Sequence, residues 1–277
     1  VEMLDKFIIV LIMSVVHTYI FYPIILALMA YLKGPQEEVE SATGFYPNVS
    51  MVVSAYNEEK NIRAKIENFL SSDYPKDRVE LIIGSDGSTD KTSDLIRPFL
   101  SERIKLFEFP ERRGKISVLN DIVKEARAEI VVFSDADTMY DKDAVRRLVG
   151  RFSDEKAGGV CGKLALYETD ESIFEEGLYW RYENFIKEKE SEIQTIVGIN
   201  GQVFAIRKEL FEPLPADTIV EDQVLGMKLL SRGYNILFEP EAIVKERIGN
   251  FREEFKRRVR ISAGNFQSIK FSKKILN

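Results

Sequence analysis

Two aspartates that follow a buried strand stand at a spacing that suits a metal ion. Residues 130–133 are four consecutive apolar side chains, which predict a buried strand at residues 130–134, and Asp135 and Asp137 come directly after it. Open α/β sheets bind ligands beyond the carboxyl ends of their strands, and carboxylate oxygens suit Mg²⁺ or Mn²⁺. The pair therefore indicates a cation that bridges the oxygens of a diphosphate. A solvated acidic turn that caps the next helix is the alternative.

Polar and aromatic side chains also follow the first two predicted strands. These side chains are Ser54, Tyr56 and Glu58 after the strand at residues 49–55, and Asp86 after the strand at residues 79–84. A ring for stacking, a carboxylate for a base N–H or a ribose hydroxyl, and small residues for close approach suit a nucleoside. Taken one at a time, each motif is equally well explained as a turn or a helix cap.

A lysine and an acidic pair begin two of the predicted helices. Lys115 follows Gly114, and because a lysine at a helix start opposes the helix dipole, a contact with a diphosphate or a base is one explanation and a solvated cation the other. Glu221 and Asp222 lie in the first turn of a later helix, where the dipole favours acidic residues in any case. Neither motif identifies a reaction by itself.

The positions of these side chains depend on an alternation of strand and helix patterns along the chain. The predicted strands are residues 49–55, 79–84, 104–109, 130–134, 158–166, 202–206 and 234–238. The predicted helices are residues 58–71, 91–100, 115–127, 141–152, 172–192 and 219–232. Repeated βα units of this length predict an α/β fold with a mostly parallel sheet and helices on both faces.

The N-terminal segment is apolar enough to cross a membrane. Residues 7–32 carry no formal charge, and a helix of that length spans ~39 Å, more than the ~30 Å hydrocarbon core of a bilayer. A signal peptide fits poorly, because the run is too long and lacks a basic start and a small-residue cleavage site. We predict a transmembrane anchor over residues 1–33 and a linker over residues 34–47, with a buried helix of a soluble protein as the alternative.

Charge is distributed unevenly. The net charge is −6 and the pI about 5.2, which argues against bulk nucleic-acid binding. Residues 245–277 nevertheless hold ten Lys or Arg and three Glu, a local net charge of +7. Apolar residues recur there at three- and four-residue intervals, so residues 247–277 are predicted to form a basic amphipathic helix and tail. Such a helix suits the headgroup plane of a bilayer, and packing against the domain is the alternative.

The motifs occur in the order seen in family 2 glycosyltransferases, which the chain resembles over residues ~48 to 270. The first set is Tyr56-Asn57-Glu58, Ser85-Asp86-Gly87-Ser88-Thr89-Asp90, Gly114-Lys115 with Leu119-Asn120, and Asp135-Ala136-Asp137. The second set, Gly198-Ile199-Asn200-Gly201, Val220-Glu221-Asp222 and Arg257-Arg258-Val259-Arg260-Ile261, resembles the branch that contains cellulose, chitin and hyaluronan synthases. Val220, Arg257 and Ile261 stand where that branch usually has Thr, Gln and Trp, and the missing Trp weakens the expectation of processive polymerisation.

The resemblance implies a GT-A fold over residues 48–246 and a membrane-anchored, inverting hexosyltransferase. The enzyme would move a sugar from a nucleotide diphosphate sugar, with UDP the preferred carrier, to a hydroxyl of a saccharide or lipid-linked acceptor. We expect the catalytic domain on the cytoplasmic side. The implied nucleotide-sugar contacts are Ser54, Tyr56, Glu58, Asp86, Lys115, Asp135 and Arg257, and the implied metal ligands for Mg²⁺ or Mn²⁺ are Asp135 and Asp137. The implied acceptor contacts are Gly198, Asn200 and Gly201, and the implied catalytic residues are Asp222 as base, Glu221 beside it, and Arg260 on the leaving diphosphate.

Three other functions remain to be distinguished. A lipid-phosphate glycosyltransferase of the dolichyl-phosphate type shares the fold and metal site, but its acceptor is already ionised, so Glu221 and Asp222 count against it. A non-catalytic nucleotide-sugar-binding subunit is expected to lack the base or the metal carboxylates, and both are present. A nucleotidyltransferase is expected to have a Gly-rich loop after its first strand, where Tyr56-Asn57-Glu58 stands instead.

Overall fold

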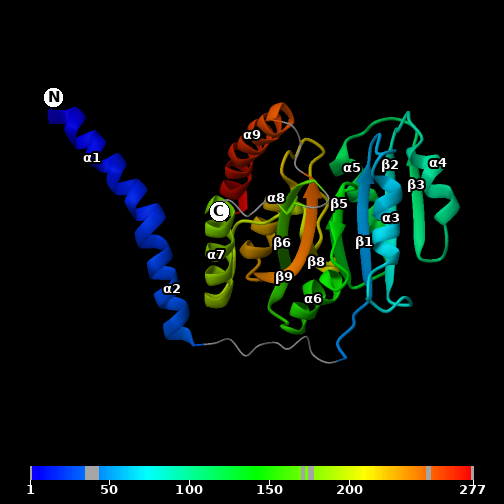
Figure 1. The fold of residues 1–277 in the computed structure, drawn as a ribbon, viewed down its shortest axis with the longest axis horizontal. Coiled ribbons are helices and arrows are strands. Elements are labelled where there is room, and N and C mark those ends of the chain that lie inside the picture. Colours follow the sequence, from blue (N-terminus) through cyan, green and yellow to red (C-terminus); the bar gives the residue numbers. More distant parts are fainter. Residues whose placement is uncertain (1, 35–43, 170–171, 174–177, 248–250, 276–277) are drawn as a thin grey trace.

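The computed structural model describes residues 2–34, 44–169, 172–173, 178–247 and 251–275 of the 277-residue chain. A nine-stranded sheet lies between helices, and an apolar N-terminal helix projects from this body (Figure 1). The strands are β1 (Val49–Ala55), β2 (Val79–Asp86), β3 (Ile104–Phe109), β4 (Ile130–Ser134), β5 (Thr138–Tyr140), β6 (Ala157–Thr169), β7 (Ser172–Ile173), β8 (Phe204–Arg207) and β9 (Asn235–Arg247). The helices are α1 (Glu2–Val16), α2 (Tyr22–Lys33), α3 (Ile62–Leu70), α4 (Thr92–Ile96), α5 (Lys115–Glu125), α6 (Ala144–Gly150), α7 (Leu178–Ile193), α8 (Glu221–Ser231) and α9 (Phe251–Ile275).

One half of the sheet is wholly parallel. The strand order is β3-β2-β1-β4-β8-β6-β9-β5, with β7 paired to β6, and the first four strands run in one direction. β1 pairs with β2 on one side and with β4 on the other, so the carboxyl ends of these three strands lie at one edge. That edge carries the residues after each strand that the sequence identified as ligands.

The other half of the sheet is mixed. β8 is antiparallel to both β4 and β6, β6 is parallel to β9, and the short β5 is antiparallel to β9. The expected α/β class with helices on both faces is confirmed, while these antiparallel pairings replace part of the expected parallel order. β5 was not predicted, and β9 continues to Arg247 because it pairs along nearly the whole of β6.

Two apolar layers fix the helices to the sheet. Ile62, Ile66 and Phe69 of α3 and Leu148 of α6 pack on one face, with alternate residues of β1 and β2. On the other face, α5 packs against the remaining alternate positions of β1 and β2, and α8 packs over β6 and β9 in the same apolar layer. Helix α3 begins at Ile62 rather than at residue 58, because the backbone N–H groups of Glu58 and Glu59 donate to the side chains of Thr92 and Asp90.

The predicted helix at residues 172–192 is split. β7 forms its first two residues, and α7 runs over Leu178–Ile193, with residues 174–177 outside the described part of the chain. Most of the predicted linker, residues 35–43, also lies outside the described residues. The helix predicted over residues 91–100 is shorter in the structure, because Pro98 follows α4 and a 3₁₀ turn at Arg97–Phe99 ends it.

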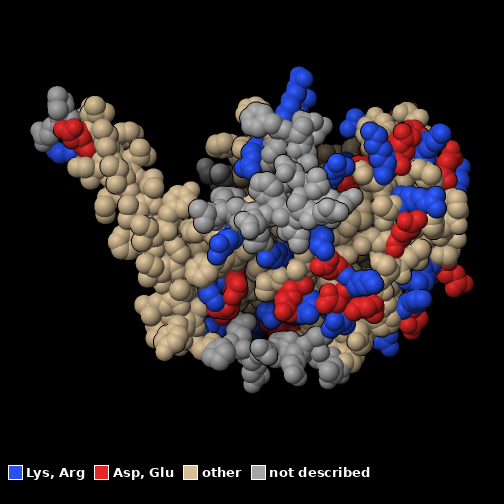
Figure 2. Space-filling view, in the orientation of Figure 1, with Lys and Arg blue, Asp and Glu red and all other residues tan. Residues whose placement is uncertain are grey.

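The first part of the apolar N-terminal helix, α1, projects from the body, and the second part, α2, packs on it (Figure 1). Within the described residues, Met3–Lys33 is the one helix long and apolar enough to cross a membrane, with a mean hydropathy of 2.2. Figure 2 shows it uncharged from just after its N-terminal tip to the body of the molecule. A π-helical turn at His17–Phe21 joins α1 to α2, and α2 packs on α7, where Tyr22 Oη donates to Glu190 Oε1 at 2.6 Å. The helix is therefore attached to the domain through α7.

Candidate active site

Two pockets adjoin at the carboxyl edge of the parallel strands. The smaller pocket has a volume of about 280 Å³, and its lining includes Ser54, Tyr56, Glu58, Asp86, Arg112 and Asp137. The larger pocket has a volume of about 530 Å³, and its lining includes Trp180, Gly198, Asn200, Gly201, Glu221 and Asp222. Lys115, Asp135 and Arg260 line both pockets, so these three side chains form the wall between them.

The floor of the smaller pocket is held by side chain to backbone hydrogen bonds. Asn57, in the left-handed region with φ 56°, accepts from the Thr89 N–H through its Oδ1 at 2.8 Å and so ties the end of β1 to the loop after β2. Asp86 is 2% exposed, and its two carboxylate oxygens accept from the N–H groups of Arg113 and Gly114 at 2.7 and 2.8 Å. Asp86 therefore shapes the loop that ends at Lys115, besides lining the pocket.

An arginine covers the tyrosine ring in the smaller pocket. The Arg112 guanidinium carbon lies 3.9 Å from the centre of the Tyr56 ring, a cation–π contact. Tyr56 remains 36% exposed, so a flat ligand can still reach this aromatic and guanidinium surface. Arg112 was not among the predicted ligands, although it stands directly before the motif that ends in Gly114 and Lys115.

Lys115 connects the two pockets through two ion pairs. Its Nζ lies 2.7 Å from Asp135 Oδ1 and 2.6 Å from Glu221 Oε1, while 35% of its side chain stays exposed. Desolvation alone would lower the pKa of Lys115, but the charges of Asp135 and Glu221 outweigh it and raise that pKa. Desolvation would likewise raise the pKa of Asp135, and the lysine charge outweighs it and lowers that pKa. Lys115 is thus a permanent positive charge between the pockets.

The chemistry of Asp135 and Asp137 fits a divalent cation that is bound together with a diphosphate. Desolvation and the negative charge of Asp135 raise the pKa of Asp137, a repulsion that a cation would relieve. No group of three or more His, Cys, Asp or Glu in the described part of the chain could hold a metal ion. Two carboxylates plus phosphate oxygens is the usual arrangement for Mg²⁺ in phosphate-handling sites. The two carboxylates could therefore supply part of a hard-cation site, with phosphate oxygens of a ligand supplying the rest.

A buried lysine lies beneath the Asp135–Asp137 turn. Lys65 of α3 is fully buried, and its Nζ donates to Ser134 Oγ at 2.6 Å and to the Thr138 carbonyl oxygen at 2.7 Å. Burial lowers the pKa of Lys65 to about 7. These bonds brace both ends of the turn that carries the two aspartates. The sequence pattern could have indicated this burial, because Lys65 lies on the apolar face of α3 together with Ile62 and Ile66.

Asp222 stands at the edge of the larger pocket with a perturbed acidity. Desolvation and the charge of Glu221 raise the pKa of Asp222 to about 6. Gly201 allows this carboxylate to approach the backbone, because a Cβ at Gly201 would meet Asp222 Oδ2 at 2.7 Å. A carboxylate with a pKa near 6 can accept a proton at neutral pH and is a stronger base than an ordinary aspartate.

Helix α9 closes the larger pocket, and small residues set how near it comes. A Cβ at Gly264 would collide with Val220 Cγ2, so only glycine allows this approach of α9 to the segment before α8. Gln267 holds the same segment, accepting from the Ile219 N–H at 2.9 Å and donating to the Asp217 carbonyl oxygen at 2.8 Å. The position of Glu221 and Asp222 thus depends on α9.

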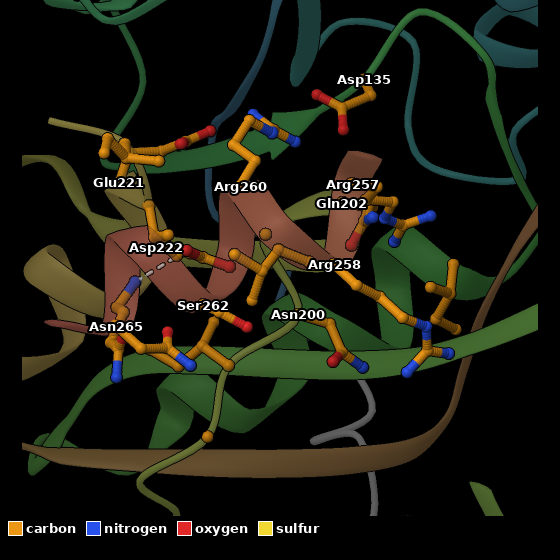
Figure 3. Close-up of a pocket in the computed structure, with 18 of the residues that line it drawn as sticks. Asp135, Asn200, Gln202, Glu221, Asp222, Arg257, Arg258, Arg260, Ser262 and Asn265 are labelled. Carbon is orange, nitrogen blue, oxygen red and sulfur yellow. Dashed lines mark hydrogen bonds between the residues drawn. The ribbon is translucent and has the colours of Figure 1, made fainter. Parts of the chain in front are cut away.

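Arg257 and Arg260 face different surroundings on α9. Arg257 pairs with Glu246 at the end of β9 at 2.9 Å and lines the larger pocket alone, whereas Arg260 lines both pockets. Figure 3 shows Asp135, Glu221 and Asp222 around one pocket, with Arg260 between Glu221 and Asp135. Glu246 is buried, and desolvation together with the negative charges of Asp137 and Asp135 raises the pKa of Glu246 to about 7. The positive charge of Arg257 opposes this shift but does not cancel it.

The structure brings every predicted site residue to one or both pockets. Ser54, Tyr56, Glu58, Asp86 and Asp137 line the smaller one, Gly198, Asn200, Gly201, Glu221, Asp222 and Arg257 line the larger one, and Lys115, Asp135 and Arg260 line both. Arg257, predicted as a nucleotide-sugar contact, lies on the larger side. The residues that sequence reasoning missed are Lys65, Arg112, Glu246, Gly264 and, in the wall of the larger pocket, Trp180.

Comparison with known proteins agrees with this arrangement. The sequence profile described as Glycosyl transferase family 2 matches residues 50–214. The Probable glycosyltransferase YdaM of Bacillus subtilis is 32% identical over 224 residues, which is 72% of this chain and 50% of that protein. The Poly-beta-1,6-N-acetyl-D-glucosamine synthase of Staphylococcus aureus is 30% identical over 249 residues, which is 86% of this chain and 58% of that protein. The chain thus spans about half the length of these relatives.

Two solved structures share the fold. The mannosyltransferase PcManGT from Pyrobaculum calidifontis, in complex with GDP-Man and Mn²⁺, superposes with a TM-score of 0.76 at 24% identity, covering 96% of this chain and 75% of its own. S. aureus TarS 1-349 in complex with UDP-GlcNAc superposes with a TM-score of 0.57 at 20% identity, covering 73% of this chain and 59% of its own. The expected GT-A architecture is confirmed.

Proposed function

Because the chain belongs to glycosyltransferase family 2, we propose that it is a membrane-anchored, metal-dependent, inverting hexosyltransferase. It moves a sugar from a nucleotide diphosphate sugar to a hydroxyl of a saccharide or lipid-linked acceptor. One observation carries the proposal: Lys115 joins the pocket that Asp135 and Asp137 line to the pocket that contains a carboxylate of raised pKa, Asp222. A transferase needs this juxtaposition, because the leaving group and the attacking hydroxyl must lie on opposite sides of one carbon atom.

The smaller pocket is proposed to hold the nucleotide. Tyr56 and Arg112 offer a surface on which a base can stack, and Ser54, Glu58 and Asp86 lie around it. We propose UDP as the carrier, because a relative is a poly-N-acetylglucosamine synthase and a structural neighbour was solved with UDP-GlcNAc. The GDP-Man complex of PcManGT shows that the fold accommodates another nucleotide, so the base contacts in this chain must make the choice.

The wall between the pockets is proposed to stabilise the departing diphosphate. Asp135 and Asp137 would hold Mg²⁺ or Mn²⁺, which neutralises phosphate charge when bound. Lys115 and the guanidinium of Arg260 supply further positive charge where the nucleotide diphosphate forms, and a guanidinium can make two parallel hydrogen bonds to phosphate oxygens. Positive charge placed there in advance favours the transition state more than the bound substrate.

Asp222 is proposed to act as the general base on the acceptor side. It accepts the proton of the attacking hydroxyl while that oxygen bonds to the anomeric carbon and the bond from that carbon to the diphosphate oxygen breaks. A single displacement of this kind inverts the anomeric configuration. The negative charge of Glu221 raises the basicity of Asp222. Glu221 itself is paired with Lys115, and this ion pair keeps Glu221 from competing with Asp222 for the proton.

Membrane attachment is proposed to place this site beside the bilayer. The apolar helix Met3–Lys33 would insert as an anchor, with the catalytic domain on the cytoplasmic side and the basic helix α9 near the lipid headgroups. The contact of α2 with α7 would then hold the larger pocket, which α7 and α9 line, on the membrane side of the domain.

The proposal is tested with the membrane-inserted protein, Mn²⁺, and UDP-N-acetylglucosamine, UDP-glucose or GDP-mannose, scoring nucleotide release and sizing the product. Asp222→Asn should lower transfer by about 10²–10⁴-fold with unchanged affinity for the nucleotide sugar. Asp217→Asn, the same change at an exposed neighbouring position, should have no effect. Transfer by Asp222→Asn at the wild-type rate, or no nucleotide release from any donor, would overturn the assignment.

A further inference from the structure

The larger pocket has a wall that comes from none of the sequence motifs. Helix α7 contributes Trp180 and Glu183, and the neighbouring β6 contributes Leu164 and Leu166. Trp180 also packs against the apolar layer that α3 and α6 share with the sheet, which limits how far its ring can move. It is the only tryptophan in the chain.

A hydrogen-bonded lysine fixes this face of α7 to the predicted acceptor motif. Lys187 is 4% exposed, and its Nζ lies 2.7 Å from Glu183 Oε1 and donates to Asn200 Oδ1 at 2.8 Å. A buried ammonium that is bound on two sides is costly to move, so Glu183 and Asn200 are held in one arrangement. Glu183 keeps 28% of its side chain exposed and can still be reached from the pocket.

This combination suits a sugar ring. A pyranose has an apolar face of C–H groups and a rim of hydroxyl groups, so it binds well to a flat aromatic ring flanked by carboxylate and amide oxygens. The larger pocket offers the indole of Trp180, the carboxylate of Glu183 and the amides of Asn200 and Gln202. Its volume of about 530 Å³ lies within the ordinary range for small-molecule sites.

We propose that Trp180 and Glu183 form a subsite for the terminal ring of a saccharide acceptor, with Trp180 stacked on the ring and Glu183 accepting from its hydroxyl groups. The inference deepens the proposed function and rests on it. A lipid phosphate is the less suitable acceptor, because it has no apolar ring face to stack on Trp180 and is already ionised, so it offers Asp222 no proton to accept. The subsite therefore selects for a saccharide end that presents a free hydroxyl to Asp222.

The single tryptophan gives a direct measurement of binding. The full chain is titrated with short oligosaccharides of β-1,6-linked N-acetylglucosamine, of glucose and of mannose, with UDP and Mn²⁺ present, while the tryptophan emission is recorded. At least one oligosaccharide should shift or quench the emission in a saturable manner, and polyprenyl phosphate in the same detergent should not. No saccharide response, or a saturable response to polyprenyl phosphate alone, would overturn the proposal.

Substitutions separate a binding role from a structural one. Trp180→Ala should raise the KM of the responding saccharide about tenfold, with the KM of the nucleotide sugar and its slow hydrolysis unchanged, and Trp180→Phe should restore most of the affinity. Phe185→Ala removes an aromatic ring from the same helix at a 38% exposed position outside the pocket and serves as the control. Unchanged saccharide KM in Trp180→Ala would contradict the subsite.

The same assays distinguish a failure of the proposed transferase function from a failure of the saccharide subsite alone. If the proposed transferase function fails, wild-type protein will release no nucleotide from any donor, whatever stands at position 180. If only the subsite fails, wild-type protein and Trp180→Ala will transfer sugar with the same saccharide KM. Glu183→Gln adds a check, because it keeps the shape of the side chain and should weaken saccharide binding without changing the affinity for UDP.

Discussion

The smaller pocket is built at the ends of strands, whereas the larger pocket is built mainly between helices. In the smaller one, side chains follow β1, β2 and β4, and hydrogen bonds to backbone groups fix their loops. In the larger one, α7, α8 and α9 each contribute lining side chains, and α9 approaches the segment before α8 closely at Gly264. Residues at the ends of paired strands have little conformational freedom, so the nucleotide side should tolerate few substitutions. Helix faces can exchange side chains without altering the sheet, so the acceptor side can change its specificity.

Lys115 belongs to both pockets, so its loss should damage both functions and give the largest effect on nucleotide binding and transfer together. Lys115→Met removes the charge between Asp135 and Glu221, and we expect kcat to fall by about 10²–10³-fold together with weaker UDP binding. Lys124→Met, on the exposed face of the same helix, is the matched control. Steady-state kinetics and calorimetry measure the two effects, and a loss confined to only one of them would show that the pockets are independent.

Lys65→Met tests the buried lysine beneath the Asp135–Asp137 turn on the nucleotide side. Burial lowers the pKa of Lys65 from 10.5 to about 7, so between these pH values the unfolded chain holds a proton that the folded chain releases. The contribution of Lys65 to stability should therefore rise from pH 7 to pH 10.5 and be flat below pH 7. We expect the wild-type protein to gain about 5 kcal/mol in free energy of unfolding relative to Lys65→Met across that interval. Equal pH profiles in denaturant titrations would contradict the burial of this charge.

Gly264→Ala tests the packing of the acceptor side. The new methyl group collides with Val220, so α9 must shift away from Glu221 and Asp222, and kcat should fall about tenfold, with a smaller loss of UDP affinity because Arg260 also lies on α9. Val220→Ala removes the methyl groups that collide, so the double variant should recover most of the activity. A double variant as impaired as Gly264→Ala would mean that the glycine acts in another way.

The pH dependence of kcat/KM is expected to show the smallest of these effects. Transfer requires ionised Asp222, whose pKa is raised to about 6, so kcat/KM should reach half its plateau near pH 6 and fall further in acid. The residual activity of Asp222→Asn should lack this limb. A limb near pH 4 in the wild-type protein would indicate an aspartate of ordinary acidity and would remove Asp222 as the perturbed base.

The contrast between the pockets also explains what the sequence could predict. The side chains at the ends of β1, β2 and β4 could be predicted, because each apolar strand is followed directly by candidate binding residues, and parallel pairing brings those residues together. The second role of Asp86, which binds the backbone before Lys115, depends on a loop that no local pattern describes. Trp180 and Gly264 were missed because their importance arises from contacts between helices far apart in the chain.

The central claim is that one continuous site divides its work between a nucleotide side and an acceptor side. The most direct test is calorimetric titration of UDP with Mn²⁺ into Asp137→Asn and Asp222→Asn, beside transfer assays of both variants. The account predicts that both variants lose transfer, that Asp222→Asn binds UDP as tightly as the wild-type protein, and that Asp137→Asn loses the Mn²⁺-dependent part of the affinity. Unchanged UDP binding by Asp137→Asn, or lost UDP binding by Asp222→Asn, would contradict it.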